Sequence, residues 1–225
     1  ARSSYSGMID LAGFKKDRFY LYQSEWRPDL PMAHILPHWN WSGREGEITP
    51  VHVFTSGDEA ELFINGQSQG KKKKGPFEYR LRFDDVRYTP GTVEVVTYKN
   101  GKRWATDSVT TSGVPSGLRL SADRNIINAD GKDLSFVTVD IVDKKGNPVP
   151  TATHRVHFSL TGPGRIVATD NGDSTNFTPF PSHERKAFCG KLLVIIQSEH
   201  NKPGELKLTA SSQALEPAVL TLRAN

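Results

Sequence analysis

Two tryptophans separated by one asparagine, Trp39 and Trp41, are the residues of this sequence best suited to contact a ligand. Aromatic rings stack on the apolar C–H face of a sugar, because that face meets the negative face of the indole. In an extended segment, a spacing of two places both rings on one side and leaves His34, His38 and Asn40 as the polar side. The pattern therefore predicts a carbohydrate platform. The competing interpretation is a structural plug between domains, which is the more frequent role because tryptophan is highly buried on average.

A second motif, Gly66-Gln-Ser-Gln-Gly70, has the Gly-x-Ser-x-Gly spacing of a hydrolase nucleophile elbow. That elbow needs a strand before the serine and a helix after it. Here Lys71-Lys-Lys-Lys74 and Gly75-Pro76 follow, a composition that cannot begin a helix. We therefore interpret these glycines as part of a hairpin, not as a catalytic turn.

Metal-binding patterns are weak. His34 and His38 are four residues apart, but Pro37 between them disfavours the helix that would bring both to one face. Asp170-Asn-Gly-Asp173 lacks the alternating acidic positions and the bidentate glutamate of a calcium loop, so a turn is the better interpretation. We expect no metal and no cofactor.

Carboxylate pairs that could cleave a glycosidic bond are also not evident. Such cleavage needs two carboxylates on opposite sides of the scissile bond. The acidic residues are scattered among turns and strand faces, and no pair has motif support. We expect no catalytic residue in this chain.

Composition indicates an ordinary protein surface. The formal net charge is +4 and 24% of residues are charged. The only dense basic run, Lys71–Lys74, has no interleaved arginine or aromatic residue, so we expect a solvated loop and no nucleic-acid partner. No apolar run is long enough for a membrane helix, and the single cysteine, Cys189, cannot form an internal disulfide.

One helix is predicted, from Lys15 to Trp26, because this stretch has no glycine or proline and is followed by Pro28. Phe19, Tyr22 and Trp26 form one apolar stripe along it. A helix this short is marginal in water, so the stripe needs a partner. We expect it to fold back on the neighbouring β domain or to pair with a second copy of the chain as a homodimer.

Alternating apolar residues after Pro31 predict strands from Met32 to Thr111. Asn65-Gly66 and Asn100-Gly101 are two-residue hairpin turns, since both positions tolerate positive φ. The apolar phase changes between Val95 and Val96, which predicts a bulge or a doubly buried strand.

A linker, Ser112–Gly117, precedes a second β pattern of about seven short strands, the spacing of an immunoglobulin-like sandwich. The fold class is therefore mostly β, with two β-sandwich domains after a short helical segment. We assign residues 1–31 to the helical segment, 32–112 to the first sandwich and 115–225 to the second.

Three segments carry a resemblance to a known family: Gly7–Trp26, His34-Ile-Leu-Pro-His-Trp-Asn-Trp41 and Glu61-Leu-Phe-Ile-Asn-Gly-Gln-Ser-Gln-Gly70. They resemble the C-terminal region of family 2 glycoside hydrolases of the β-galactosidase type. The resemblance implies that residues 7–26 are the exit from the last strand and the final helix of a (β/α)8 barrel. It also implies that the catalytic glutamates lie on earlier barrel strands, and that Asp10 falls in the loop leaving the last strand, where a substrate contact is conceivable.

The second β domain resembles bacterial immunoglobulin-like domains of the invasin and intimin type, through Asn128–Gly131, Val137–Asp143, Gly146–Pro150 and Val156–Phe158. Together the resemblances imply a non-catalytic accessory region that serves the barrel of its parent chain in carbohydrate degradation. They imply a periplasmic or secreted bacterial protein. The alternatives are an independent carbohydrate-binding module and an adhesin-like spacer.

Overall fold

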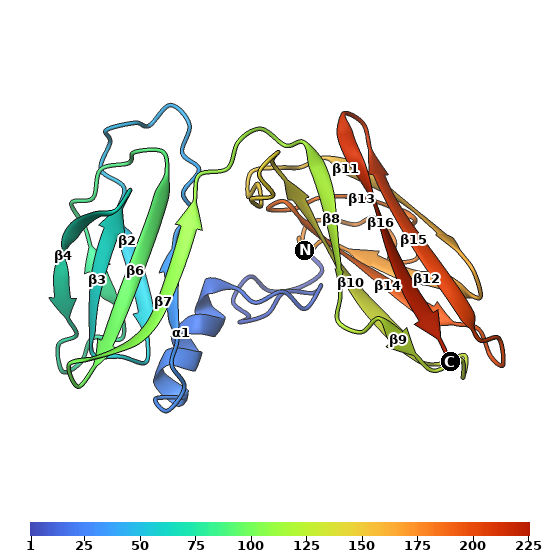
Figure 1. Cartoon of the computed structure of the whole chain (residues 1–225), viewed down its shortest axis with the longest axis horizontal. Helices are drawn as coiled ribbons and strands as arrows, with labels where there is room; N and C mark the ends of the chain where they lie inside the picture. Colours follow the sequence, from blue (N-terminus) through green and yellow to red (C-terminus); the bar gives the residue numbers. More distant parts are fainter. The chain divides into compact units, whose positions relative to one another are not determined.

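The computed structural model describes all 225 residues and divides them into two compact units of β-structure (Figure 1). One unit, the C-terminal sandwich, comprises Ser112–Asn225 with two N-terminal segments, Ala1–Tyr5 and Asp10–Phe14. The other unit, the N-terminal sandwich, comprises Lys15–Thr111 with Ser6–Ile9. The predicted class, mostly β with two sandwiches and one short helix, is confirmed.

The N-terminal sandwich has a three-stranded and a four-stranded antiparallel sheet. In spatial order they are β1 (Ala33–Leu36), β2 (Val51–Thr55) and β5 (Leu81–Phe83), then β4 (Gln67–Lys73), β3 (Glu59–Ile64), β6 (Thr92–Lys99) and β7 (Lys102–Thr110). Both sheets contribute apolar side chains to one core, which includes Val53 of β2 and Leu62 of β3. Successive side chains of a strand point to opposite faces, so the alternating apolar side chains lie on the face that packs into the core.

Both predicted hairpin turns are confirmed. Asn65 and Gly66 join β3 to β4 with φ of 50° and 80°, and Asn100 and Gly101 join β6 to β7 with φ of 51° and 74°. These left-handed conformations match the twist of the flanking strands. A bulge occurs in this strand, but further along than the predicted phase change: the register shifts between Thr97 and Tyr98, while Val95 and Val96 stay in register with Asp107 and Thr106.

The sequence predicted a solvated loop for the lysine run, and this prediction is wrong. Lys71, Lys72 and Lys73 belong to the exposed edge strand β4. Lys71 lies opposite Glu61 and Lys73 opposite Glu59, so opposite charges face each other across the pair. Lysines on an edge strand also discourage pairing with another chain. The opposite charges on the neighbouring strand favour the extended conformation of a run that has little β propensity of its own.

The helix α1 (Asp17–Trp26) packs against β1 and β2 of the same unit, with Tyr20 stacked on His34 at a centroid distance of 3.9 Å. Ser24 is its one buried residue. The stripe predicted to be covered is turned outward, since Tyr22 and Trp26 are exposed. The helix therefore contacts the sandwich through a different face from the one that its apolar pattern indicated.

The C-terminal sandwich has two antiparallel sheets, linked where β8 and β16 run parallel at Gly117 and Glu216. One sheet orders β12 (Gly164–Asp170), β14 (Lys191–Ser198), β10 (Leu134–Val142) and β8 (Gly117–Ala122). The other orders β16 (Leu215–Ala224), β15 (Gly204–Ser212), β11 (Arg155–Thr161) and β13 (Glu184–Lys186), with β9 (Ile126–Ile127) beside β16. The core between them is aliphatic, with Val139 and Leu208 fully buried.

Candidate functional site

The segment after β1 carries four of the five predicted site residues, His38, Trp39, Asn40 and Trp41, and all lie in the N-terminal sandwich. This segment has no regular secondary structure. The alternation of an extended strand therefore does not hold, and the two tryptophans are placed in different environments.

Trp39 is a core residue. Its side chain is 1% exposed, and its Nε1 donates to the carbonyl oxygen of Thr89 at 2.9 Å. Its ring meets Tyr88 edge-to-face at 5.1 Å, and its own carbonyl accepts a hydrogen bond from Thr111 Oγ1. No face of this indole is open to a sugar, and its position is the structural one, within the core of its own sandwich.

Trp41 is partly exposed and stacks on His38, with ring centroids 4.5 Å apart and an interplanar angle of 20°. The guanidinium carbon of Arg44 lies 5.5 Å from the same indole centroid. Trp41 Nε1 is buried and donates to no group of the protein. The exposed part of the ring, beside the Arg44 cation, forms a surface that an oxygen-rich ligand fits, whereas the buried Nε1 is not part of that surface.

His38 is held in one protonation state. The backbone N–H of Asn40 donates to His38 Nδ1 at 3.2 Å, so the ring proton of a neutral imidazole is on Nε2. Burial lowers the pKa of His38, and the more distant Asp17 opposes that shift. The lowered pKa favours the neutral imidazole, whose Nε2–H can donate to an oxygen of a ligand.

Around His34 lies a polar group that the sequence did not indicate. His34 Nε2 is 2.8 Å from Asp17 Oδ1 of α1, and Tyr20 stacks on the same imidazole. Burial raises the pKa of Tyr20, as do the charges of Asp107 and Asp17. Asp107 Oδ2 accepts the Ile35 N–H at 2.8 Å. No local motif could have shown this group, because its members come from α1, β1 and β7.

Asp10, the fifth predicted residue, lies in the C-terminal sandwich unit and closes a turn. Its Oδ1 accepts the Phe14 N–H at 2.9 Å, and its own N–H donates to the Phe14 carbonyl at 3.0 Å. The structure therefore gives Asp10 a local structural role and assigns it to a different unit from the other four.

The other motifs have structural roles. Ser68 lies in β4 and donates to Glu61 Oε1 at 2.7 Å, so the Gly66–Gly70 motif is the predicted hairpin and no helix follows it. Asp173 Oδ1 accepts both the N–H and the hydroxyl of Thr175, which makes the Asp170–Asp173 segment the predicted turn.

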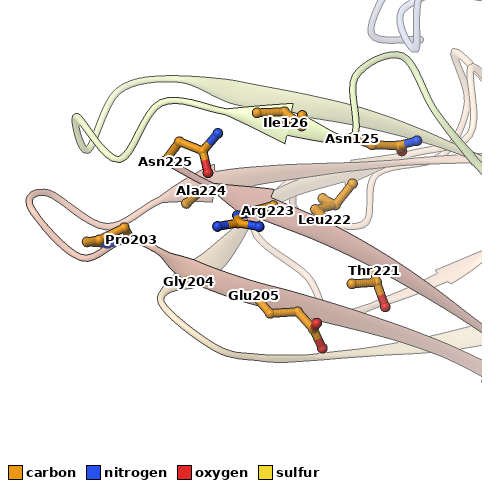
Figure 2. A pocket seen from close by; sticks show the side chains of 10 residues that line it. All are labelled: Asn125, Ile126, Pro203, Gly204, Glu205, Thr221, Leu222, Arg223, Ala224 and Asn225. Atoms are coloured by element: carbon orange, nitrogen blue, oxygen red, sulfur yellow. The ribbon is translucent and has the colours of Figure 1, made fainter.

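One groove of the C-terminal sandwich, about 560 Å³ in volume, lies where β15 begins and where β9 and β16 end (Figure 2). Glu205 and Arg223 lie opposite each other across the β15–β16 pair on its wall, and Ile126 and Pro203 supply apolar surface. No aromatic ring lines it. It therefore lacks the stacking platform of a typical sugar site. No helix of the chain is long and apolar enough to cross a membrane.

Comparison with known proteins accounts for both units. Residues 118–221 match the model of glycoside hydrolase family 2 C-terminal domain 5, and residues 46–105 match a domain family of unknown function, DUF4982. The chain is 47% identical over 224 residues to β-galactosidase BoGH2A of Bacteroides ovatus, covering 100% of this chain and 26% of that protein.

A β-glucuronidase of Formosa agariphila is 29% identical, covering 77% of this chain and 18% of that protein. A crystal structure of a β-glycosidase from Bacteroides vulgatus superposes with a TM-score of 0.92 at 35% identity, covering 97% of this chain and 28% of that one. The chain thus spans about a quarter or less of the length of these relatives.

Proposed function

The chain corresponds to the C-terminal accessory region of family 2 glycoside hydrolases, and we propose that it serves the catalytic barrel of a β-galactosidase-type enzyme without hydrolysing glycosides itself. The observation that carries this proposal is the similarity of the whole chain to about a quarter of a larger β-galactosidase, together with the match of residues 118–221 to a C-terminal domain of the family. Retaining glycosidases need two carboxylates flanking the bond. No pair of acidic residues here has that motif support.

The outward face of α1 supports a barrel as partner. Tyr22 and Trp26 stack on each other at 4.8 Å and are both exposed, with Trp26 67% exposed. Their burial against another surface would contribute on the order of 1.5–3 kcal/mol per side chain. In a family 2 enzyme this helix would be the final helix of the barrel, and this face would lie against its neighbouring barrel helix.

Trp41, His38 and Asn40 are the part of the region that we propose to contact substrate. Trp41 offers a partly exposed ring, and His38 offers the Nε2–H of its neutral imidazole. These groups suit the C–H face and the hydroxyls of a sugar lying in the cleft of the intact enzyme. Trp39 is left out of this contact surface because the core covers it.

The experiment is to assay the parent enzyme with nitrophenyl β-galactoside, β-glucoside and β-glucuronide, carrying Trp41→Ala or the control Trp104→Ala. Trp104 is a partly buried tryptophan of the same unit whose Nε1 donates to Ser56 Oγ at 2.8 Å. We expect Trp41→Ala to lower kcat/KM about tenfold, as truncation of a contacting aromatic does, and Trp104→Ala to leave it unchanged. Equal effects of both variants would contradict the contact.

A second candidate function is an independent carbohydrate-binding module, favoured by the partly exposed Trp41 ring. It differs in one measurable respect, because such a module binds glycan without the barrel. Affinity-gel retardation of the isolated chain on galactan separates the two. Retardation that Trp41→Ala removes supports the module, whereas free migration supports the accessory role.

A further inference from the structure

The first residues of the chain belong to the C-terminal sandwich, although the N-terminal sandwich is closer to them in sequence. Ala1–Tyr5 and Asp10–Phe14 belong to the same compact unit as Ser112–Asn225. The contacts converge on one loop of that unit, residues 171–183 between β12 and β13, which we call the clamp loop.

Arg2 makes the first set of contacts with the clamp loop. Its backbone N–H donates to the Ser174 carbonyl at 2.6 Å, and its Nη2 donates to the Thr178 carbonyl at 3.0 Å. Its guanidinium carbon lies 4.5 Å from the ring centroid of Phe180 and 5.9 Å from that of Phe177. Arg2 is thus bound through its main chain, through Nη2 and through its planar face, whereas its buried Nη1 has no hydrogen-bond partner.

Asp10 makes the second set. Its carboxylate lies directly over Gly172, where a Cβ would come within 2.1 Å of Asp10 Oδ2. Gly172 also has a φ of +77°, which side-chain-bearing residues rarely adopt. Only a glycine permits this approach, so Gly172 sets how closely the 10–14 turn lies on the sandwich.

Arg185, which is 1% exposed, holds the clamp loop through hydrogen bonds. Its guanidinium donates to the carbonyls of Thr178 and Pro179, both at 2.9 Å, and to the Thr169 carbonyl. A buried arginine that donates to carbonyls of a loop and of the strand before it stabilises one conformation of that loop. The hydrogen bonds of Arg185 therefore fix the conformation of the surface that Arg2 and Asp10 contact, independently of those two residues.

We propose that the clamp loop positions the active site of the intact enzyme, with Gly172 and Arg185 as positioning residues that act through Asp10 and Arg2. This rests on the proposed function, in which residues 7–26 leave the last barrel strand and form the final helix. The loop after a barrel strand lies on the face where barrel active sites are built. A loop shift of about 1 Å at such a site can lower the rate about 100-fold.

Gly172→Ala tests the clamp, with Gly146→Ala as the matched control. Gly146 is in the same sandwich and has a φ of +83°, but no atom lies within 4 Å of the position of its Cβ. Both variants thus introduce the same kind of backbone strain, and only Gly172→Ala displaces Asp10. Arg2→Ala is a second variant, which removes the other contact without touching the glycine.

In the isolated chain, hydrogen exchange of residues 1–14 should be at least about tenfold faster in Gly172→Ala than in Gly146→Ala, since the protecting contacts open more often. In the parent enzyme, kcat/KM of Gly172→Ala and Arg2→Ala should fall at least about tenfold, mainly in kcat, at an unchanged melting temperature relative to Gly146→Ala. A purely structural contact would lower the melting temperature and leave the activity of the folded enzyme intact.

Unchanged kinetics in all variants of an active parent enzyme would overturn the clamp and leave the proposed function standing. A parent chain with no barrel before Ala1 would overturn both. Unchanged hydrogen exchange in Gly172→Ala would show that Asp10 and Gly172 do not hold the segment, and would overturn the clamp without any assay of activity.

Discussion

Trp39 Nε1 donates a 2.9 Å hydrogen bond to the carbonyl oxygen of Thr89. The bond satisfies the one polar atom of the indole inside a core where burial without a partner would be costly. Trp41, two residues later, has an indole nitrogen without a protein partner. Two neighbouring tryptophans therefore differ in environment, Trp39 in the core and Trp41 partly exposed, and each can be tested by itself.

Trp39→Ala should destabilise the N-terminal sandwich by about 3–5 kcal/mol, because it leaves a large cavity and an unpaired Thr89 carbonyl. Urea denaturation of the chain measures the loss. Trp41→Ala is the control and should cost clearly less, since its ring is only partly buried. Equal losses for both variants would contradict the division of roles.

Asp143 should make the C-terminal sandwich sensitive to acid. Burial alone would raise its pKa, but hydrogen bonds from Gly113, Asn147 and Lys145 lower it to about 2. The unfolded chain protonates this carboxyl near the ordinary value of 3.8, so the stability that it contributes is complete above about pH 4. That stability should be lost as the pH falls from about 4 to about 2.

Asp143→Asn checks this directly, since the amide cannot ionise. The variant should be less stable than the parent chain at about pH 6, and the difference should shrink towards about pH 2. Chemical denaturation across this range gives both curves. A constant difference at every pH would show that Asp143 acts only through its shape and its neutral hydrogen bonds.

The exposed face of α1 should make the isolated chain associate. Tyr22 and Trp26 present one aromatic patch, and two copies could cover it symmetrically. Light scattering should show a concentration-dependent dimer that Tyr22→Ser/Trp26→Ser reduces to monomer. Gln23→Ser is a control on the same helix. A chain that is monomeric at every concentration would contradict the pairing.

The two sandwiches should fold independently. Their cores share no residue, and the chain between Thr110 of β7 and Gly117 of β8 connects them, in addition to the N-terminal segment, which alternates between the two units. Limited proteolysis should cut this connection first, and residues 1–111 and 112–225 expressed apart should each melt cooperatively. One transition that disappears when the chain is split would indicate a single fused core.

Local sequence signals predicted much of the fold. Positive φ at Asn65-Gly66 and Asn100-Gly101 follows from residue type alone, and alternation placed Leu62 and Val53 in the core. About seven strands were expected in the second sandwich, whereas nine form. The short strands β9 and β13 have two and three residues, too few for any periodicity to appear.

Local sequence patterns gave wrong predictions where contacts between distant segments determine the conformation. The apolar stripe of α1 predicted that Tyr22 and Trp26 would be covered, whereas the helix packs through Tyr20 at the margin of that stripe, because the stacking of Tyr20 on His34 depends on β1. Strand formation by Lys71–Lys73 depends on Glu59 and Glu61 of the neighbouring strand. Trp39 and Trp41 differ in burial because the segment is irregular, which their spacing could not reveal.

The most direct test of the central claim compares hydrolysis of nitrophenyl β-galactoside by the isolated chain and by the parent enzyme at equal molar concentration. We predict turnover by the parent enzyme and none above buffer by the chain. Absence of turnover would show that the acidic residues of the chain do not suffice for hydrolysis by themselves. Turnover by the isolated chain that a single substitution in it abolishes would contradict the accessory role.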